Sequence, residues 1–250
     1  MDKSFICSPN LPKNNVSTVI IGKAYESRLK NAFDRLKIRA ISAEPSRNVD
    51  NRISNHIDLQ LIHLGKNKFV ANKDNIDLVN ILTDYGAEVF VSESSLDSTY
   101  PDDCILNACI INEHIIHNLD ITDFAILKNL NKSIKPINVQ QGYSKCNVCI
   151  LNSKSIITSD KKIADATERC GFEVLLIKPG YISLPGYEYG FIGGASVKLS
   201  ENTVAFTGKF DKHPDCQKIL DFITERKISI EYLSHEDIFD VGSIIPIFEN

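Results

Sequence analysis

The chain has 250 residues, of which 43% are hydrophobic and 24% are charged, an ordinary balance for a globular protein. Its formal net charge of −4 gives no indication of a general nucleic-acid or membrane-surface binder, which would need a basic stripe. The apolar runs are far shorter than the roughly 20 residues that span a bilayer, and the first residues contain no apolar signal core. We therefore expect a cytoplasmic protein whose seven cysteines are reduced thiols.

The N-terminal part predicts a strand, a helix and a second strand. STVIIG reads as the first strand and IRAIS as the second. Between them, apolar residues recur at helical spacing and predict one buried helix face: Tyr25, Leu29, Phe33 and Leu36. This segment has no hairpin partner for its first strand, unlike the segments that follow.

Four later segments share one pattern of strand, tight turn, strand, amphipathic helix and strand. The first begins at His56 with HIDLQLIHL, turns at 65–67 and continues through KFVA, a helix from Ile76 to Tyr85 and the strand AEVFVS. The others begin near Pro101, Gly142 and Phe191, with first strands CILNACII, KCNVCIL and GGASVKL. The second copy has its helix over 121–132. Starts at intervals of roughly 45 residues indicate a repeat architecture.

The two chain ends complete each other. The C-terminal VGSIIPIF reads as one strand with nothing after it, and the N-terminal segment lacks a first strand. Joined, they form a fifth copy, and such closure would remove exposed sheet edges. We therefore predict an α/β fold, a five-bladed propeller of one domain over 1–250. An open α/β sheet is the alternative, although the hairpin in each unit forces antiparallel pairing that a doubly wound parallel sheet lacks.

In such a ring, the first strand of each copy would line a central channel, and polar residues near the strand starts would converge there. We expect these residues to form a wet, shaped site. They are His56, Asp58, Asp102, Asp103, Asn107, Lys145, Cys146, Asn147, Gly193, Gly194, Ser196, Asp240, Gly242 and Ser243. The paired glycines 193 and 194 would let a ligand or another backbone approach closely, or would form a bulge. The Pro- and Tyr-rich segment 178–190 reads as a long lid or binding loop.

Five such units resemble the pentein fold of guanidino-group-modifying enzymes, which include arginine deiminases, dimethylarginine dimethylaminohydrolases, agmatine deiminases and amidinotransferases. The ring is also similar to that of the ribosome anti-association factor, which is not an enzyme. His56-Ile57-Asp58 looks like the His-x-Asp strand motif of the enzymes. The segments QGYSKCNVCI, ITSD, GFIGGAS and DVGSIIP look like an uncharacterised bacterial branch of the superfamily.

The resemblance implies a cysteine nucleophile, a histidine acid/base and carboxylates that hold a guanidinium group. In those enzymes the cysteine lies near the C-terminus, whereas the last cysteine here is Cys216, on a helix face. Our candidate nucleophile is Cys146, with His56 as acid/base. A thiolate would attack the amidine carbon, and an imidazolium would protonate the departing amine.

The remaining candidates would bind the substrate. Asp58 and Asp103 (or Asp102) would pair with the guanidinium, and Asn107, Lys145, Gly194, Ser196 and Asp240 would line the site. If Lys145 and Cys146 lie on one strand, their side chains point to opposite faces.

Several readings of the same residues stay open. Cys146 and Cys149 could be ordinary core thiols, and His56 a rim histidine bonded to backbone. The Cys-x-x-Cys pair suggests a redox or zinc motif, but it would fall inside a strand and has no second pair. We therefore expect no metal and no cofactor. Two functions remain: a cysteine-dependent hydrolase or transferase for a small guanidine or amidine compound, or a non-catalytic module that binds a small cation or a macromolecule.

Overall fold

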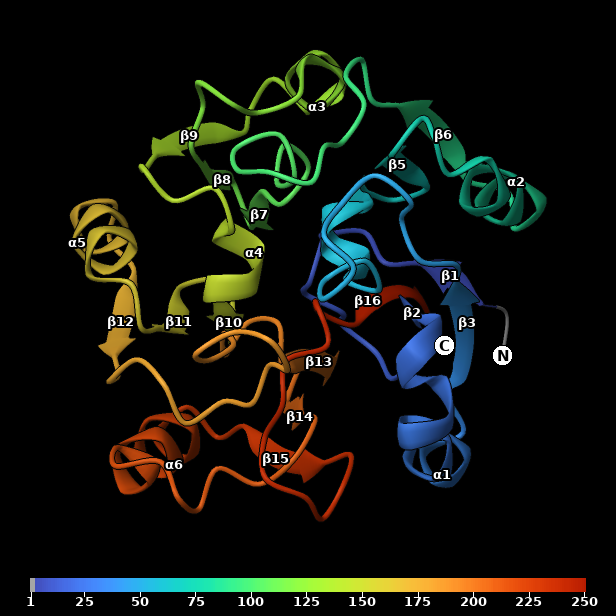
Figure 1. The fold of residues 1–250 in the computed structure, drawn as a ribbon. Coiled ribbons are helices and arrows are strands. Elements are labelled where there is room, and N and C mark those ends of the chain that lie inside the picture. The colour runs from blue at the N-terminus through green and yellow to red at the C-terminus, as the bar shows by residue number, and fades with distance from the viewer. Residues whose placement is uncertain (1–2) are drawn as a thin grey trace.

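Five small sheets are arranged around a central axis in the computed structural model, which describes residues 3–250 (Figure 1). Four of the sheets have three strands and the fifth has four. In each sheet an inner strand pairs antiparallel with a middle strand, which in turn pairs parallel with an outer strand. The predicted α/β propeller of five repeated units is confirmed.

Each sheet with its crossover helix is called a blade, numbered 1 to 5 from β4. The inner strands are β4 (Leu61–Gly65), β7 (Cys109–Ile111), β10 (Cys149–Ile150), β13 (Ser196–Ser200) and β16 (Ile245–Glu249). The middle strands are β5 (Lys68–Ala71), β8 (His114–His117), β11 (Ser155–Thr158), β14 (Thr203–Phe206) and β2 (Val16–Gly22). The outer strands are β6 (Glu88–Val91), β9 (Lys135–Asn138), β12 (Glu173–Leu176), β15 (Ser229–Tyr232) and β3 (Arg39–Ala43).

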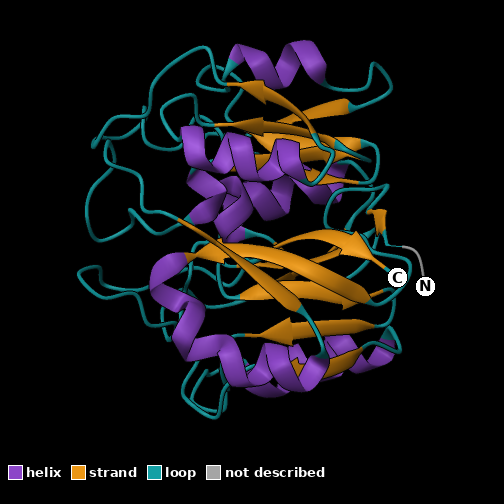
Figure 2. Ribbon diagram, turned by 90° about the vertical axis from the view of Figure 1, so that its right-hand side faces the viewer, coloured by secondary structure: helices purple, strands orange, loops and turns teal. Residues whose placement is uncertain are grey.

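Helices between the middle and outer strands cover the rim of the ring (Figures 1 and 2). They are α2 (Ile76–Asp84), α3 (Phe124–Asn129), α5 (Lys161–Arg169), α6 (Cys216–Glu225) and α1 (Glu26–Leu36). Side-chain N-caps mark the starts of α2, α3 and α5. In α5 the Asp160 carboxylate accepts hydrogen bonds from the backbone N–H groups of Lys162 and Ile163 at 2.8 and 3.0 Å. Helix α3 is shorter than the predicted 121–132. Within the described part of the chain, no helix is both long and apolar enough to cross a bilayer.

The two chain ends close the ring, as the sequence predicts. Strand β16 pairs antiparallel with β2, with Ile245 opposite Ile20. A short strand that the sequence analysis missed, β1 (Ser4–Phe5), pairs with the other side of β16. Blade 5 is therefore built from both termini, and its integrity depends on contacts across the whole length of the chain.

The hydrophobic core is divided among the blade interfaces. Each of five buried clusters draws side chains from two neighbouring blades, because the flat faces of the sheets pack against one another around the axis. Examples from successive interfaces are Phe69 with Ile20, Val70 with Ile110, Ile116 with Ile156, Ile157 with Phe206, and Ala205 with Val19. Buried polar residues, among them His56, Asp58 and Asn107, lie between these clusters at the centre of the ring.

Two predicted strand starts are short helical turns instead. Residues 57–59 form the 3-10 helix η2 (Ile57–Leu59), and residues 144–147 form α4 (Ser144–Asn147); a second 3-10 turn, η1 (Lys23–Tyr25), precedes α1. Long-range hydrogen bonds replace the strand ladder there. The Asp58 backbone N–H donates to Gly242 O at 3.1 Å, and the backbone N–H groups of Lys145 and Cys146 donate to Asn107 Oδ1 at 2.9 and 3.2 Å.

Candidate active site

Three side chains of different chemistry meet at the centre of the ring. His56 precedes η2, Asp58 lies within it, and Cys146 lies on α4. One nitrogen, one oxygen and one sulfur atom from these residues all lie within 4.8 Å of one another. The Cys146 thiol donates to Asp58 Oδ2 at 3.0 Å. All three residues are buried, and both His56 Nε2 and Asp58 Oδ1 have no hydrogen-bond partner within the described chain.

Asn107 and Ser243 hold this cluster from two other blades. The Asn107 amide donates to Cys146 Sγ at 3.3 Å, while its carbonyl oxygen accepts from the α4 backbone. The Ser243 hydroxyl donates to Asp58 Oδ2 at 2.5 Å. Ser243 has a left-handed backbone (φ 67°), a strained conformation for a residue with a side chain. The thiol and the carboxylate are thus fixed by groups far apart in sequence.

The helix α4 overturns two expectations about its residues. Lys145 does not point away from the site as a strand neighbour would, because its Nζ donates to Ser243 Oγ at 3.2 Å and reaches Asp58 through that hydroxyl. Cys146 and Cys149 do not share a strand, since Cys146 belongs to α4 and Cys149 begins β10.

Asp240 is packed against the predicted glycine pair. Its carboxylate accepts from the backbone N–H groups of Phe191 and Gly242, both at 2.8 Å. A Cβ on Gly194 would lie 2.0 Å from Asp240 Oδ1, and a Cβ on Gly193 would lie 2.4 Å from the carbonyl oxygen of Lys145. Both glycines therefore serve close approach, one to a carboxylate and the other to the α4 backbone.

Burial and negative charge dominate the electrostatics. Burial, with the charges of Asp58 and Asp240, raises the pKa of the Cys146 thiol well above its usual value. Burial lowers the pKa of His56, so the imidazole is neutral at pH 7. Burial raises the pKa of Asp240 to about 6, although its backbone hydrogen bonds oppose that shift. The resting site holds a protonated thiol beside a carboxylate.

Tyr25 lies beside the site, although the sequence analysis placed it only on a buried helix face. Its ring centroid lies 6.5 Å from that of His56, and burial together with the charges of Asp240 and Asp58 raises the pKa of its hydroxyl to about 12. The sequence could not separate the two roles, because Tyr25 has the helical spacing of Leu29 and Phe33. In the structure it lies in the 3-10 turn that precedes α1.

Two predicted substrate-binding residues make other contacts. The Asp103 carboxylate accepts a hydrogen bond from the Tyr143 hydroxyl, while its second oxygen is buried without a partner in the described chain. Ser196 begins β13 and lines a cavity of about 10 Å³, room for one water molecule, with Lys145 and Lys198. Neither residue has a hydrogen bond to His56, Asp58 or Cys146 within residues 3–250.

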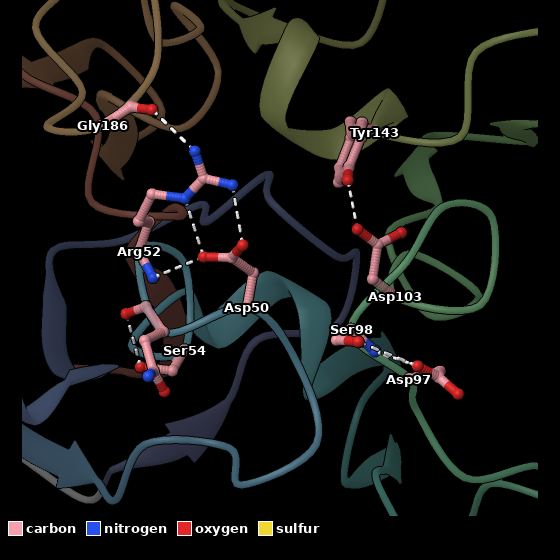
Figure 3. Close-up of polar contacts among 9 residues, drawn as sticks. Asp50, Arg52, Ser54, Asp97, Ser98, Asp103, Tyr143 and Gly186 are labelled. Atoms are coloured by element: carbon pink, nitrogen blue, oxygen red, sulfur yellow. Dashed lines mark hydrogen bonds and ion pairs between the residues drawn. The ribbon is translucent and has the colours of Figure 1, made fainter.

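Loops from three blades cover one face of the ring. Figure 3 shows Arg52 between Asp50 and Gly186, opposite the Tyr143–Asp103 pair. Arg52 donates to Gly186 O at 2.9 Å, and its guanidinium lies 4.4 Å from the centroid of the Tyr187 ring. The loop 178–190 is held at its start by the Lys178 backbone N–H, which donates to Asp215 Oδ2 at 2.8 Å, and just beyond its end by the Phe191 backbone N–H, which donates to Asp240 Oδ2 at 2.8 Å.

We predict that Arg52→Ala increases access to Cys146. The substitution removes the hydrogen bond to Gly186 and the contact with the Tyr187 ring, while the backbone bonds of Ser183 remain, so the part of the loop around Gly186 should open more often. The measurement is the rate of Cys146 alkylation by iodoacetamide, read by peptide mass spectrometry, with a several-fold increase expected. Arg35→Ala is the control, because Arg35 pairs with Glu231 on the rim. Equal rates in both variants would contradict a closing role for Arg52.

Comparison with known protein families identifies the family of this chain. A model described as a family of unknown function (DUF6873) matches residues 20–245. The chain belongs to this family. No curated protein matches the DUF6873 chain.

Solved structures of the same ring exist at low sequence identity. The amidinotransferase SxtG of Microseira wollei, from the saxitoxin biosynthetic pathway, aligns with a TM-score of 0.59 and 9% identity, over 98% of each chain. A cysteine-to-serine variant of C. jejuni agmatine deiminase with substrate bound aligns with a TM-score of 0.57 and 9% identity, over 100% of this chain and 98% of that one. A cysteine-to-serine variant of Pseudomonas aeruginosa DDAH complexed with citrulline has a TM-score of 0.52 and 9% identity, over 87% and 92%. The DUF6873 chain has the pentein fold, as its resemblance implied.

Proposed function

We propose that the DUF6873 chain is a cysteine-dependent hydrolase or transferase that acts on a small guanidine or amidine compound. The observation that carries this proposal is the buried cluster of His56, Asp58 and Cys146, whose nitrogen, oxygen and sulfur atoms lie within 4.8 Å of one another. The same ring in an amidinotransferase and in an agmatine deiminase supports the general kind of reaction.

A cationic ligand would be attracted by two buried carboxylates. Asp58 Oδ1 has no partner within the described residues and is the free acceptor for a guanidinium N–H. Asp240 adds negative charge nearby, while Lys145 offsets part of it through Ser243. Since these side chains are buried, the ligand would enter as the 178–190 loop opens.

The reaction would begin with the thiol proton. Asp58 Oδ2 accepts the Cys146 S–H, and this proton would pass to His56 Nε2, which has no hydrogen-bond partner in the part of the chain that is described. The thiolate then attacks the amidine carbon, forming a C–S bond, and the imidazolium protonates the amine as the C–N bond breaks. Water would release the amidine group in a hydrolase, and an amine would accept it in a transferase.

The charge of the substrate is needed for this chemistry. Without it, burial together with the charges of Asp58 and Asp240 keeps the pKa of the Cys146 thiol raised and the thiol protonated, and a bound guanidinium would offset both carboxylates. The same raised pKa of Cys146 favours a second candidate, a module that binds the cation without turnover.

We predict that affinity for a guanidine probe falls in acid. Burial raises the pKa of Asp240 to about 6, so this carboxyl is ionised at pH 7.5 and becomes mostly neutral by pH 5. If the ionised form provides the attraction, affinity for agmatine should fall about tenfold over that interval. Calorimetric titration at both pH values measures this, and unchanged affinity would exclude Asp240 from the electrostatics of binding.

The proposal is tested with purified protein and a panel of agmatine, L-arginine and methylated arginines. Released ammonia and amines report turnover, and intact mass reports an amidino adduct. Turnover with an adduct mapped to Cys146 supports the enzyme. Saturable binding of a panel compound without adduct or turnover contradicts it and establishes the binding module.

A further inference from the structure

The central cluster is also a set of metal-binding side chains. His56, Asp58 and Cys146 supply imidazole nitrogen, carboxylate oxygen and thiol sulfur, the three ligand types that Zn²⁺ takes in proteins. Mg²⁺ and Ca²⁺ prefer sites built only from oxygen, so this mixed set selects against them. Within residues 3–250 it is the one group of three or more such residues with this spacing.

The spacing suits a small ion. Bonds of about 2.0–2.3 Å in a tetrahedral site place neighbouring donor atoms about 3.5 Å apart. The cluster lies within 4.8 Å throughout, and Cys146 Sγ and Asp58 Oδ2 are already 3.0 Å apart. Side-chain rotations would therefore suffice to close the atoms on a metal.

His56 and Asp58 each have one buried ring or carboxylate atom without a hydrogen-bond partner in the described chain. His56 Nε2 and Asp58 Oδ1 have no partner among residues 3–250, and their residues are only 3% and 1% exposed. Unpartnered buried polar atoms are rare and costly. A bound ion would satisfy both atoms at once.

We propose that His56, Asp58 and Cys146 bind one Zn²⁺ ion, and that this ion blocks the Cys146 thiol. Binding forms a Zn–S bond and releases the thiol proton to solvent, with no change in oxidation state. A thiolate and a carboxylate neutralise the two positive charges of the ion, which suits a buried site. Metal binding stands independently of the reaction proposed above, and only the inhibition rests on it.

The surrounding hydrogen bonds already orient the ligands. Asn107 donates to the Cys146 sulfur, Ser243 donates to Asp58 Oδ2, and Lys145 donates in turn to Ser243. Outer contacts of this kind typically change metal affinity about 10–100-fold when removed. They also hold a carboxylate and a thiol together before the ion arrives, which lowers the cost of ordering them.

The first experiment titrates the reduced, chelator-treated protein with Co²⁺, whose thiolate bond produces a charge-transfer absorption band. We expect one Co²⁺ per chain, displaced by Zn²⁺. Cys146→Ser should abolish the band, and Asp58→Asn, which keeps the side-chain shape, should weaken binding at least about 100-fold. Cys149→Ser, a buried thiol three residues away, is the matched control and should leave the titration unchanged. Circular dichroism checks that each variant is folded.

The second measurement follows the thiol itself. One equivalent of Zn²⁺ should protect Cys146 from iodoacetamide, and a chelator should restore labelling. Co²⁺ binding without loss on Cys146→Ser, or no stoichiometric binding by the wild-type protein, would overturn the metal site. Neither readout uses a guanidine substrate, so a chain that binds zinc but turns over no substrate would refute the proposed reaction alone.

Discussion

Turnover of guanidine compounds is expected to fall by at least about 10³-fold in Cys146→Ala, because the substitution removes the only atom proposed to bond to the amidine carbon. The protein should remain folded, since Cys146 lies on a four-residue helix whose backbone is held by Asn107 Oδ1. Removing a buried thiol costs modest packing energy. Initial rates of ammonia or amine release, measured at saturating substrate, give the comparison.

Cys149→Ala is the matched control for that variant. Cys149 is also buried, and burial likewise raises the pKa of its thiol, to about 11. Unlike Cys146, Cys149 is the first residue of strand β10 and has no hydrogen bond to Asp58 within residues 3–250. Its activity should stay within a few-fold of the wild-type value. If both alanine variants kept full turnover, Cys146 would not be the nucleophile.

The second large effect is expected from Gly193→Ala. A Cβ at this position would lie 2.4 Å from Lys145 O, 2.6 Å from Cys146 O and 2.6 Å from Val148 N. All three are backbone atoms, which cannot rotate aside as a side chain can, so α4 must shift. We expect a loss of about 3 kcal/mol in the free energy of unfolding, seen as a fall of about 6–12 °C in Tm.

The same substitution should displace the thiol from Asp58, because Cys146 is carried by the helix that moves. Iodoacetamide labelling of Cys146 should therefore change, along with any turnover. Gly171→Ala is the control: Gly171 has φ +85°, but a Cβ added there would meet no atom within 4 Å. Its cost is therefore backbone strain of about 1–2 kcal/mol, with no effect on Cys146. Equal stability loss and unchanged labelling in both variants would contradict the close approach.

The repeated units could be read from the sequence because their signals are local. Alternating apolar residues, turn residues and helical spacing predicted the hairpin and helix of each blade. The N-terminal unit lacks a first strand and the C-terminal segment is a single strand, and this predicted the pairing of β16 with β2. The site could be located only in outline, as a set of polar residues near the strand starts. His56, Asp58, Asn107 and Cys146 do come together, whereas Asp103 and Ser196 make other contacts.

The sequence by itself determined the five-unit α/β ring and the central position of its polar residues, since periodicity and turn chemistry act between near neighbours. Only the tertiary structure decided that Cys146 lies on a helix, that Lys145 reaches Asp58 through Ser243, and that Tyr25 lies beside His56. The physical reason is the range of the forces involved. Asn107 holds α4 from 38 residues away, and Ser243 holds Asp58 from 185 residues away, so these hydrogen bonds exist only once the ring has closed.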